Sequence, residues 1–248
     1  MKAEAYERMT ASADDHWWYA GRRAILTEIV KQALMERGSQ GARVLDLGCG
    51  VSSPVKQSWP GVKTFAADRS SLALNARRAQ GSSGGLRCDL TALPFAPRQF
   101  DLVLLLDVLE HLDDEGVMLA AIRSLLRPNG ALIVTVPAYP FLWSGEDYVS
   151  EHRRRYRRDD LRRVIEQAGY VVKRATYFNT WLFPIMAGTI LWERTMVPKN
   201  RFRSNVRPIP FTINTALNRI FASERWWLRR GDFPFGGSLL CLAHAQNT

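Results

Sequence analysis

The sequence predicts an α/β protein built on a doubly wound, mostly parallel sheet. Short apolar runs without polar alternation, as expected for strands buried on both faces, occur at 43–47, 63–67, 101–106 and 131–136. Segments with helical spacing alternate with them, at 22–36, 71–79 and 115–126. Such alternation requires right-handed crossovers, and therefore predicts a parallel sheet covered by helices on its faces.

Further along the chain, the pattern predicts one more helix and two more strands. Asp159 or Asp160 is suited to cap a helix that Gly169 ends, and the strands are expected at 170–177 and 238–243. With a short strand before Cys88, the sheet would have seven strands. The long segment 177–237 is expected to be a helical insertion before the last strand, with a functional role.

A chain of 248 residues that is 46% hydrophobic suits one large domain. We expect a single domain over 1–248, with an N-terminal helical cap (1–40), a core (41–176), an inserted lid (177–237) and the last strand (238–248). The three cysteines match neither a disulfide framework nor a zinc-ligand spacing, so no metal is expected. The polar N-terminus does not resemble a signal peptide, which favours a cytoplasmic location.

Positive charge is concentrated in the C-terminal part. Residues 151–248 contain 18 Lys and Arg against 7 Asp and Glu, whereas 1–150 contain 16 against 17. The excess indicates an anionic substrate, a membrane surface or nucleic acid, or else a solvated arginine-rich face. The run His152-Arg-Arg-Arg-Tyr-Arg-Arg158 is its densest part. Because the run lacks interleaved stacking aromatics, we expect no nucleic-acid partner.

Carboxylates follow the predicted strands where each one ends. Val44-Leu-Asp-Leu-Gly-Cys-Gly50 places Asp46 at a strand end, with glycines that let the backbone turn and approach a ligand. Asp68 ends the next strand, 22 positions later, and suits the two hydroxyls of a ribose. Asp89 and Asp107 reach the same edge. The joint pattern predicts a nucleoside-binding site there.

These motifs resemble those of the class I S-adenosylmethionine-dependent methyltransferases, a Rossmann-like fold. VLDLGCG, TFAADRS, CDLTALPF, FDLVLLLDVLEH and LRPNGALI are each similar to family motifs over about residues 40–175, most closely those of the ubiquinone-pathway O-methyltransferases. The resemblance implies S-adenosylmethionine as cofactor. It also implies a set of cofactor-binding residues, which comprises Asp46, Gly48, Cys49, Gly50, Asp68, Arg69, Asp89, Leu90 and Asp107.

One departure concerns the residues after the glycine loop. The family usually continues with a small residue and a further glycine, whereas Val51-Ser-Ser-Pro54 stands here. Ser53 as N-cap and Pro54 at the first helical position still allow a short helix. A nicotinamide enzyme is the main alternative on this fold, but its fingerprint requires a third glycine where Ser53 lies.

The segment His16-Trp-Trp-Tyr-Ala-Gly-Arg-Arg23 combines aromatic and basic residues just before the first predicted helix. It is interpreted either as a helix start or as a flap over the cofactor. In the second case Trp18 and Tyr19 would stack on the cofactor and Arg22 would meet its methionine carboxylate.

Methyl transfer to a hydroxyl requires a group that removes a proton, and histidine is suited to that role. His111 follows the fourth strand and is the first candidate. His152 follows the fifth-strand loop and is the second, and either could instead have a structural role.

The insertion begins with its least polar stretch, YFNTWLFPIMAGTILW at 177–192, which is too short and interrupted to predict a membrane-spanning helix. Four basic residues follow between 199 and 207, so 177–207 is expected to contact a membrane peripherally, at its inner face. The sequence thus predicts methyl transfer to a hydrophobic small molecule that is anionic or lipid-linked, with O-methylation favoured. The alternative is an inactive cofactor-binding protein that associates with membrane or protein partners.

Overall fold

A computed structural model describes residues 15–36, 40–54, 59–79, 85–90, 92–196 and 209–246 of the chain. Within these residues the strands form one seven-stranded sheet in the order β3-β2-β1-β4-β5-β7-β6. They are β1 (Arg43–Leu47), β2 (Lys63–Asp68), β3 (Gly85–Arg87), β4 (Phe100–Leu106), β5 (Leu126–Pro137), β6 (Tyr170–Phe178) and β7 (Ser238–Ala245). Strand β7 is antiparallel to both its neighbours, and the other pairings are parallel. The predicted doubly wound α/β fold is confirmed.

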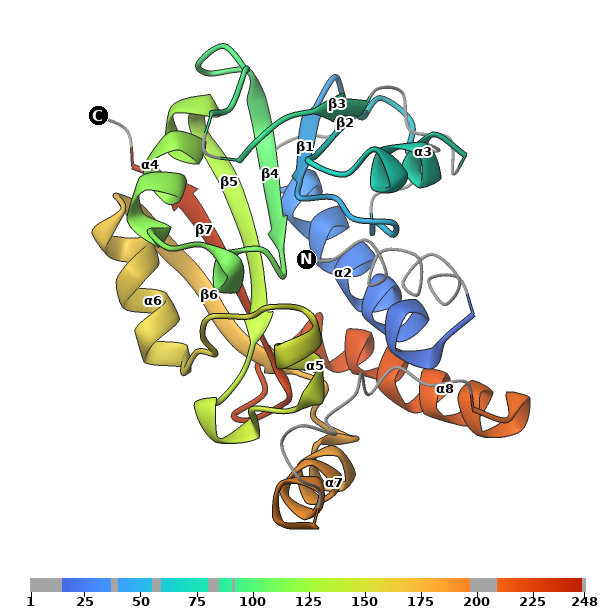
Figure 1. The fold of residues 1–248 in the computed structure, drawn as a ribbon. Helices are drawn as coiled ribbons and strands as arrows, with labels where there is room; N and C mark the ends of the chain where they lie inside the picture. Colours follow the sequence, from blue (N-terminus) through green and yellow to red (C-terminus); the bar gives the residue numbers. More distant parts are fainter. Residues whose placement is uncertain are drawn as a thin grey trace.

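The described helices are α2 (Trp17–Met35), α3 (Ser71–Ala79), α4 (Glu115–Leu125), α5 (Gly145–Val149), α6 (Arg158–Gln167), α7 (Phe183–Met196) and α8 (Phe211–Leu228). Short 3-10 turns occur at Leu109–His111 and Pro140–Leu142. Helices α4 and α6 contact each other and the sheet, while α2 packs along α8 (Figure 1). Figure 1 also shows α7 projecting from the end of the molecule below the sheet.

The central strands form the core because their side chains are apolar on both faces. Leu102, Val103, Leu104 and Leu105 of β4 are all fully buried, and so are the residues 131–134 of β5 that pair with them. The carboxyl ends of β1, β2, β4 and β5 consequently meet at one edge, where ligands of open α/β sheets bind.

The insertion between β6 and β7 contains α7 and α8, which play different parts. Helix α8 packs against α2, with the rings of Trp17 and Phe221 5.8 Å apart in an edge-on contact. A Cβ on Gly21 would lie 2.6 Å from the Phe221 ring, so the two helices approach closely at that glycine. The Trp17 N–H donates to Asn214 Oδ1 at 2.8 Å, across 197 positions of the sequence. Within the described residues, no helix combines the length and apolarity that a membrane crossing requires.

Two local predictions differ from the structure. The helix predicted over 22–36 already begins at Trp17, so the segment 16–23 is a helix start, one of its two interpretations; His16 is the N-cap and accepts a hydrogen bond from the Trp18 N–H. At α6, Arg157 occupies the N-cap position, while Asp159 and Asp160 lie in the first turn, where carboxylates stabilise the positive end of the helix dipole. The helix predicted after Ser53 would fall largely on residues 55–58, outside the described part of the chain.

Candidate active site

A cavity of about 1130 Å³ opens at the carboxyl edge of the sheet. Its lining includes all the residues singled out from the sequence: Trp18, Tyr19, Arg22, Asp46, Gly48, Cys49, Gly50, Asp68, Arg69, Asp89, Leu90, Asp107, His111 and His152. The fold thus brings together residues from the N-terminal helix, four strand ends and the loop after β5. Most of them follow β1, β2, β3 and β4, which are neighbours at one half of the sheet.

The glycine loop after β1 lines the half of the cavity that lies next to β1, β2, β3 and β4. Gly48 and Gly50 have positive φ angles of 69° and 54°, which glycine adopts without strain. A Cβ on Gly48 would lie 2.5 Å from Val108 Cγ2, whereas a Cβ on Gly50 would meet no atom within 4 Å. Gly48 is therefore needed for packing and turn geometry, and Gly50 leaves space for a ligand beside bare backbone.

Two carboxylates border that space. Asp68 accepts hydrogen bonds from the backbone N–H groups of Gly50 (3.0 Å) and Ser70 (2.8 Å), which orient its side chain. Asp46 is only 4% exposed, its Oδ2 has no hydrogen-bond partner, and burial raises its pKa above the ordinary value. A buried carboxylate oxygen without a partner is costly and suits a cationic ligand group such as the α-ammonium of S-adenosylmethionine. The residues present therefore fit this cofactor.

Two arginines of helix α2 bond to residues that line this half of the cavity, Asp107 and Ser52. Arg22 Nη2 forms an ion pair with Asp107 Oδ2 at 2.8 Å and donates to the Thr135 hydroxyl at 2.9 Å, and that hydroxyl donates to Asp107 Oδ1. Arg23 donates to the Ser52 hydroxyl at 3.0 Å. The sequence suggested that Arg22 binds the cofactor carboxylate directly; in the structure it is engaged with Asp107, although its buried Nε has no partner.

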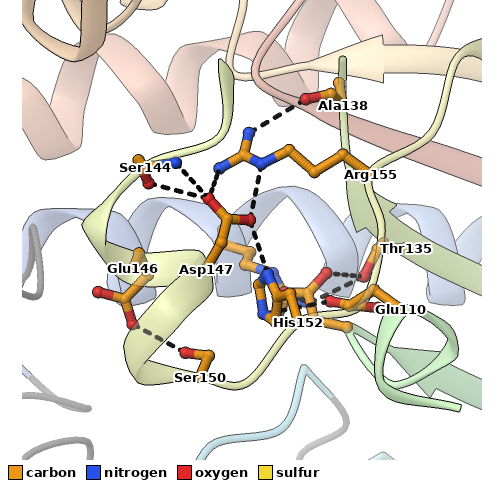
Figure 2. A network of polar contacts seen from close by, with 11 residues as sticks. Glu110, Thr135, Ala138, Ser144, Glu146, Asp147, Ser150, His152 and Arg155 are labelled. Carbon is orange, nitrogen blue, oxygen red and sulfur yellow. Dashed lines mark hydrogen bonds and ion pairs between the residues drawn. The ribbon is translucent and has the colours of Figure 1, made fainter. Parts of the chain in front are cut away.

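The loop after β5 carries a buried polar network that sequence analysis missed (Figure 2). Ser144 and Asp147 form a capping box at the start of α5, since the Ser144 side chain accepts from the Asp147 backbone N–H and the Ser144 N–H donates to Asp147 Oδ2. The Ser144 hydroxyl also donates to Asp147 Oδ2. Arg155 binds the same carboxylate through both oxygens at 2.7 and 2.8 Å. His152 Nδ1 lies 2.9 Å from Asp147 Oδ1. The Ser-x-x-Asp spacing was the available signal for the capping box, but its link to His152 depends on tertiary structure.

These contacts determine the protonation of the pair. Burial alone would raise the pKa of Asp147, but hydrogen bonds from His152 and Arg155 outweigh burial and hold it below the ordinary value. The Asp147 carboxylate is therefore charged and can only accept, so His152 Nδ1 carries the hydrogen. In the neutral ring this tautomer makes Nε2, on the opposite side, the nitrogen that can accept a proton.

Glu110 and His111 face this histidine. Both carboxylate oxygens of Glu110 are buried without a partner, and burial followed by repulsion from Asp107 raises its pKa well above the usual range. Glu110 Oε1 lies 3.9 Å from His152 Nε2, and the rings of His111 and His152 are 4.8 Å apart. Burial, with His152 as a second cause, lowers the pKa of His111 to about 4.

Glu110, His111 and His152 also lie close enough to one another to hold a metal ion. One donor atom from each of Glu110, His111 and His152 lies within 4.8 Å of the other two. Imidazole nitrogens and a carboxylate oxygen are suitable ligands for several divalent metals. No metal was expected from the sequence, which shows only Glu110 and His111 as neighbours.

The arginine run after His152 is largely engaged in ion pairs. Arg153 pairs with Asp113, Arg154 with Glu115 at 3.0 Å, and Arg155 with Asp147. The first two pairs connect the loop to the start of α4. Charges already paired with carboxylates have a reduced capacity to bind an anionic acceptor, so the structure accounts for much of the run without one.

The far half of the cavity is lined by the end of β5, the start of β7 and the insertion. The described insertion residues in the lining are Asn179, Met186, Ile190 and Gly237. Met186 and Ile190 lie on α7, whereas no residue of α8 takes part. The lid predicted over 177–237 therefore divides into α7, which borders the cavity, and α8, which supports α2.

A family model described as a methyltransferase domain matches residues 17–175. The chain belongs to this methyltransferase family, and it is an enzyme whose cofactor is S-adenosylmethionine. The nicotinamide alternative is thereby set aside. The match begins at the first residue of α2 and ends within β6, and so covers the sheet edge described above.

Curated relatives include two proteins named ubiquinone biosynthesis O-methyltransferase. The one from Dinoroseobacter shibae is 28% identical over 63% of this chain and 72% of its own length. The one from Ruegeria pomeroyi is 34% identical over 45% of this chain and 47% of its own length. The chain thus spans about half the length of the second relative.

Similar solved structures support the fold. A methyltransferase in complex with the Trm112 activator of Haloferax volcanii is 19% identical, with a TM-score of 0.63 over 99% of this chain and 96% of that one. The magnesium protoporphyrin IX methyltransferase of Synechocystis, with bound S-adenosylmethionine, is 14% identical, with a TM-score of 0.60 over 98% and 92%.

Proposed function

We propose that this methyltransferase methylates a hydroxyl group of an apolar, lipid-linked small molecule, and that His152 is the general base. The observation that carries the proposal is the contact of His152 Nδ1 with the buried Asp147 carboxylate, in a histidine that lines the cavity. The names of the curated relatives favour oxygen as the methylated atom.

In this proposal the near half of the cavity binds the cofactor, whose sulfonium supplies the methyl group. Asp46 would accept from its ammonium, and Asp68 from its ribose hydroxyls. Cys49, Arg69, Asp89 and Leu90 would complete the nucleoside end, and Trp18 and Tyr19 would cover it. Asp107 would hold Arg22, and Arg22 would keep α2 closed over the ligand and exclude water.

His152 is a better base than His111, the first candidate from sequence. A base must be unprotonated yet basic enough to take a hydroxyl proton, and a pKa of about 4 makes His111 a weak base. In His152 the Asp147 carboxylate both fixes the tautomer and stabilises the imidazolium that forms after proton transfer. His111 is then proposed to position the His152 ring through their edge-on contact.

The apolar character of the acceptor is inferred from α7. Its Met186 and Ile190 border the cavity, while Ile185, Trp192 and Met196 on its other side are 66%, 65% and 61% exposed. A helix with exposed apolar side chains, followed in sequence by basic residues, suits the surface of an anionic membrane. We propose that α7 contacts the cytoplasmic face of a membrane, so that a lipid-linked acceptor can pass from the bilayer to the cavity.

The catalytic part is tested by transfer of labelled methyl groups from S-adenosylmethionine to a lipid extract. His152→Ala should lower turnover by about 10²-fold or more, the usual loss of a general base. His111→Ala should lower it less, and His244→Ala on β7 is the matched control. Turnover of His152→Ala within threefold of the wild type would exclude the proposed base.

Cofactor binding is tested separately by calorimetry. Arg22→Ala should raise the S-adenosylmethionine dissociation constant at least about tenfold, because it removes the charged hydrogen bonds that connect α2 to Asp107 and Thr135. Unchanged affinity would show that closure of α2 does not contribute to binding.

Membrane contact is tested by co-sedimentation with vesicles that contain phosphatidylglycerol. Trp192→Glu should reduce the bound fraction at least about tenfold, because it places a charge in the interfacial face. Met35→Glu on α2 is the matched control, since Met35 is 67% exposed and lies outside this face. Equal loss in both variants would refute a specific role for α7.

A further inference from the structure

Asn179 is a buried side chain whose hydrogen bonding is incomplete. It is 1% exposed, lines the cavity, and its Oδ1 has no hydrogen-bond partner. Its Nδ2 donates to the Met186 sulfur at 3.5 Å. Because a thioether sulfur accepts but cannot donate, the amide nitrogen belongs on that side and the carbonyl oxygen faces elsewhere. An unpaired buried carbonyl costs free energy unless a ligand supplies a donor.

The position of Asn179 is in the acceptor half of the cavity. It directly follows β6, whose last residue pairs with Ser238, and Ser238 pairs with Pro137 at the end of β5. In the strand order, β6 is the edge strand opposite the β1, β2 and β3 end where Asp46, Asp68 and Asp89 lie. A ligand that contacts Asn179 is therefore the methyl acceptor, not the nucleoside.

Glu224 of α8 holds this asparagine in place. Its buried carboxylate accepts from three successive backbone N–H groups, those of Asn179 (2.7 Å), Thr180 (2.6 Å) and Trp181 (2.8 Å). Asn179 itself has a φ of 59°, a left-handed conformation that a non-glycine residue keeps only when its surroundings determine it. The three bonds supply that constraint at the start of α7.

The surrounding atoms leave little freedom to the amide. The backbone N–H of Gly237 donates to the backbone carbonyl oxygen of Asn179 at 3.1 Å. A Cβ on Gly237 would lie 2.5 Å from Met186 Cε and 3.1 Å from Asn179 Nδ2. The side chain is thus packed in one orientation, as expected of a group that recognises a fixed feature of a ligand.

We infer that Asn179 Oδ1 accepts a hydrogen bond from a hydroxyl or N–H group of the methyl acceptor, and that Glu224 positions Asn179 for this contact. The inference rests on the proposed function, since it assigns the acceptor to this half of the cavity. It adds a polar requirement to an otherwise apolar wall. An acceptor with a donor group near its apolar body is selected, and one that lacks the donor leaves the buried carbonyl unpaired.

The test compares two probes that differ only in the hydroxyl group, 4-pentylphenol and pentylbenzene. Their binding is measured by tryptophan fluorescence with saturating S-adenosylhomocysteine, so that no methyl transfer occurs. Wild-type protein should bind the phenol at least about tenfold more tightly. Asn179→Gly, which keeps the left-handed backbone and deletes the amide, should bind both within threefold. The matched control Asn218→Ala on α8 should keep the wild-type preference.

The positioning role has its own readout. Glu224→Gln should lower the ratio of the two affinities, whereas a residue that only stabilises the fold would leave the ratio unchanged in the folded fraction. A wild-type ratio near one, or a ratio that Asn179→Gly preserves, overturns the inference; an unchanged ratio in Glu224→Gln overturns the positioning role. Labelled methyl transfer from S-adenosylmethionine to a lipid extract decides the proposed function separately, because that assay does not depend on the two probes.

Discussion

The buried carboxylate of Glu224 makes stability depend on pH in a predictable direction. The side chain is fully buried, and burial raises its pKa to about 7, although three backbone N–H donors act in the opposite sense. Glu224→Gln removes this titration at nearly constant side-chain size. The comparison of the two proteins across pH therefore isolates the free energy associated with one proton.

The magnitude follows from the two pKa values. An unfolded chain has the ordinary glutamate pKa of 4.5, and the folded protein has about 7. Because the folded state binds the proton more tightly, its stabilising effect is fully present below the lower value and is lost as pH rises through the higher one. At about 1.4 kcal/mol per pKa unit, the wild type should lose about 3 kcal/mol relative to the variant.

The assay is urea unfolding of both proteins at intervals from about pH 5 to about pH 8, compared as the difference in the free energy of unfolding. Glu193→Gln on α7 controls for the loss of one negative charge. A difference that stays constant over this range would refute the reasoning. It would mean that the three N–H donors outweigh burial and keep the carboxylate charged throughout.

Three further predictions concern the cavity. Gly48→Ala should weaken S-adenosylmethionine binding at least about tenfold and lower the free energy of unfolding by about 1–3 kcal/mol. The reason is that the new Cβ would lie 2.5 Å from Val108 Cγ2, at a backbone φ of 69°. Wild-type affinity by calorimetry would contradict this. Asp147→Asn should lower turnover by about 10²–10⁴-fold, because the His152 tautomer is no longer fixed; a loss below tenfold would exclude that role. Dialysis against a chelator should leave turnover within about twofold; a larger loss that divalent metal restores would instead make Glu110 and His152 metal ligands.

Elements with strong local patterns were predictable from the sequence. The strand at 43–47 and the helix at 71–79 have the expected bounds, because a buried apolar run and a helical repeat are each determined by nearby residues. The aspartates at strand ends were predicted to meet at one edge, and Asp46, Asp68, Asp89 and Asp107 line one cavity. Parallel topology is sufficient to bring them together.

Contacts between distant residues were not predictable in the same way. Glu224 reads as an ordinary charged residue of a helix, and only the folded chain brings it to the backbone 43 to 45 positions earlier. The start of α2 was misplaced because aromatic residues have modest helix propensity, whereas packing of Trp17 on Phe221 favours the helix there. His152 looked like part of a basic surface run until Asp147 was placed beside it.

The pairing of α2 with α8 also has a consequence for synthesis of the chain. The Trp17 N–H cannot form its hydrogen bond to Asn214 until that residue has emerged from the ribosome, 197 residues later. At typical elongation rates this delay is on the order of 10 to 40 seconds, during which the nascent N-terminal helix lacks its partner. A fragment that stops before α8 would keep this helix exposed, so we expect such nascent chains to depend on chaperones until α8 has been synthesised.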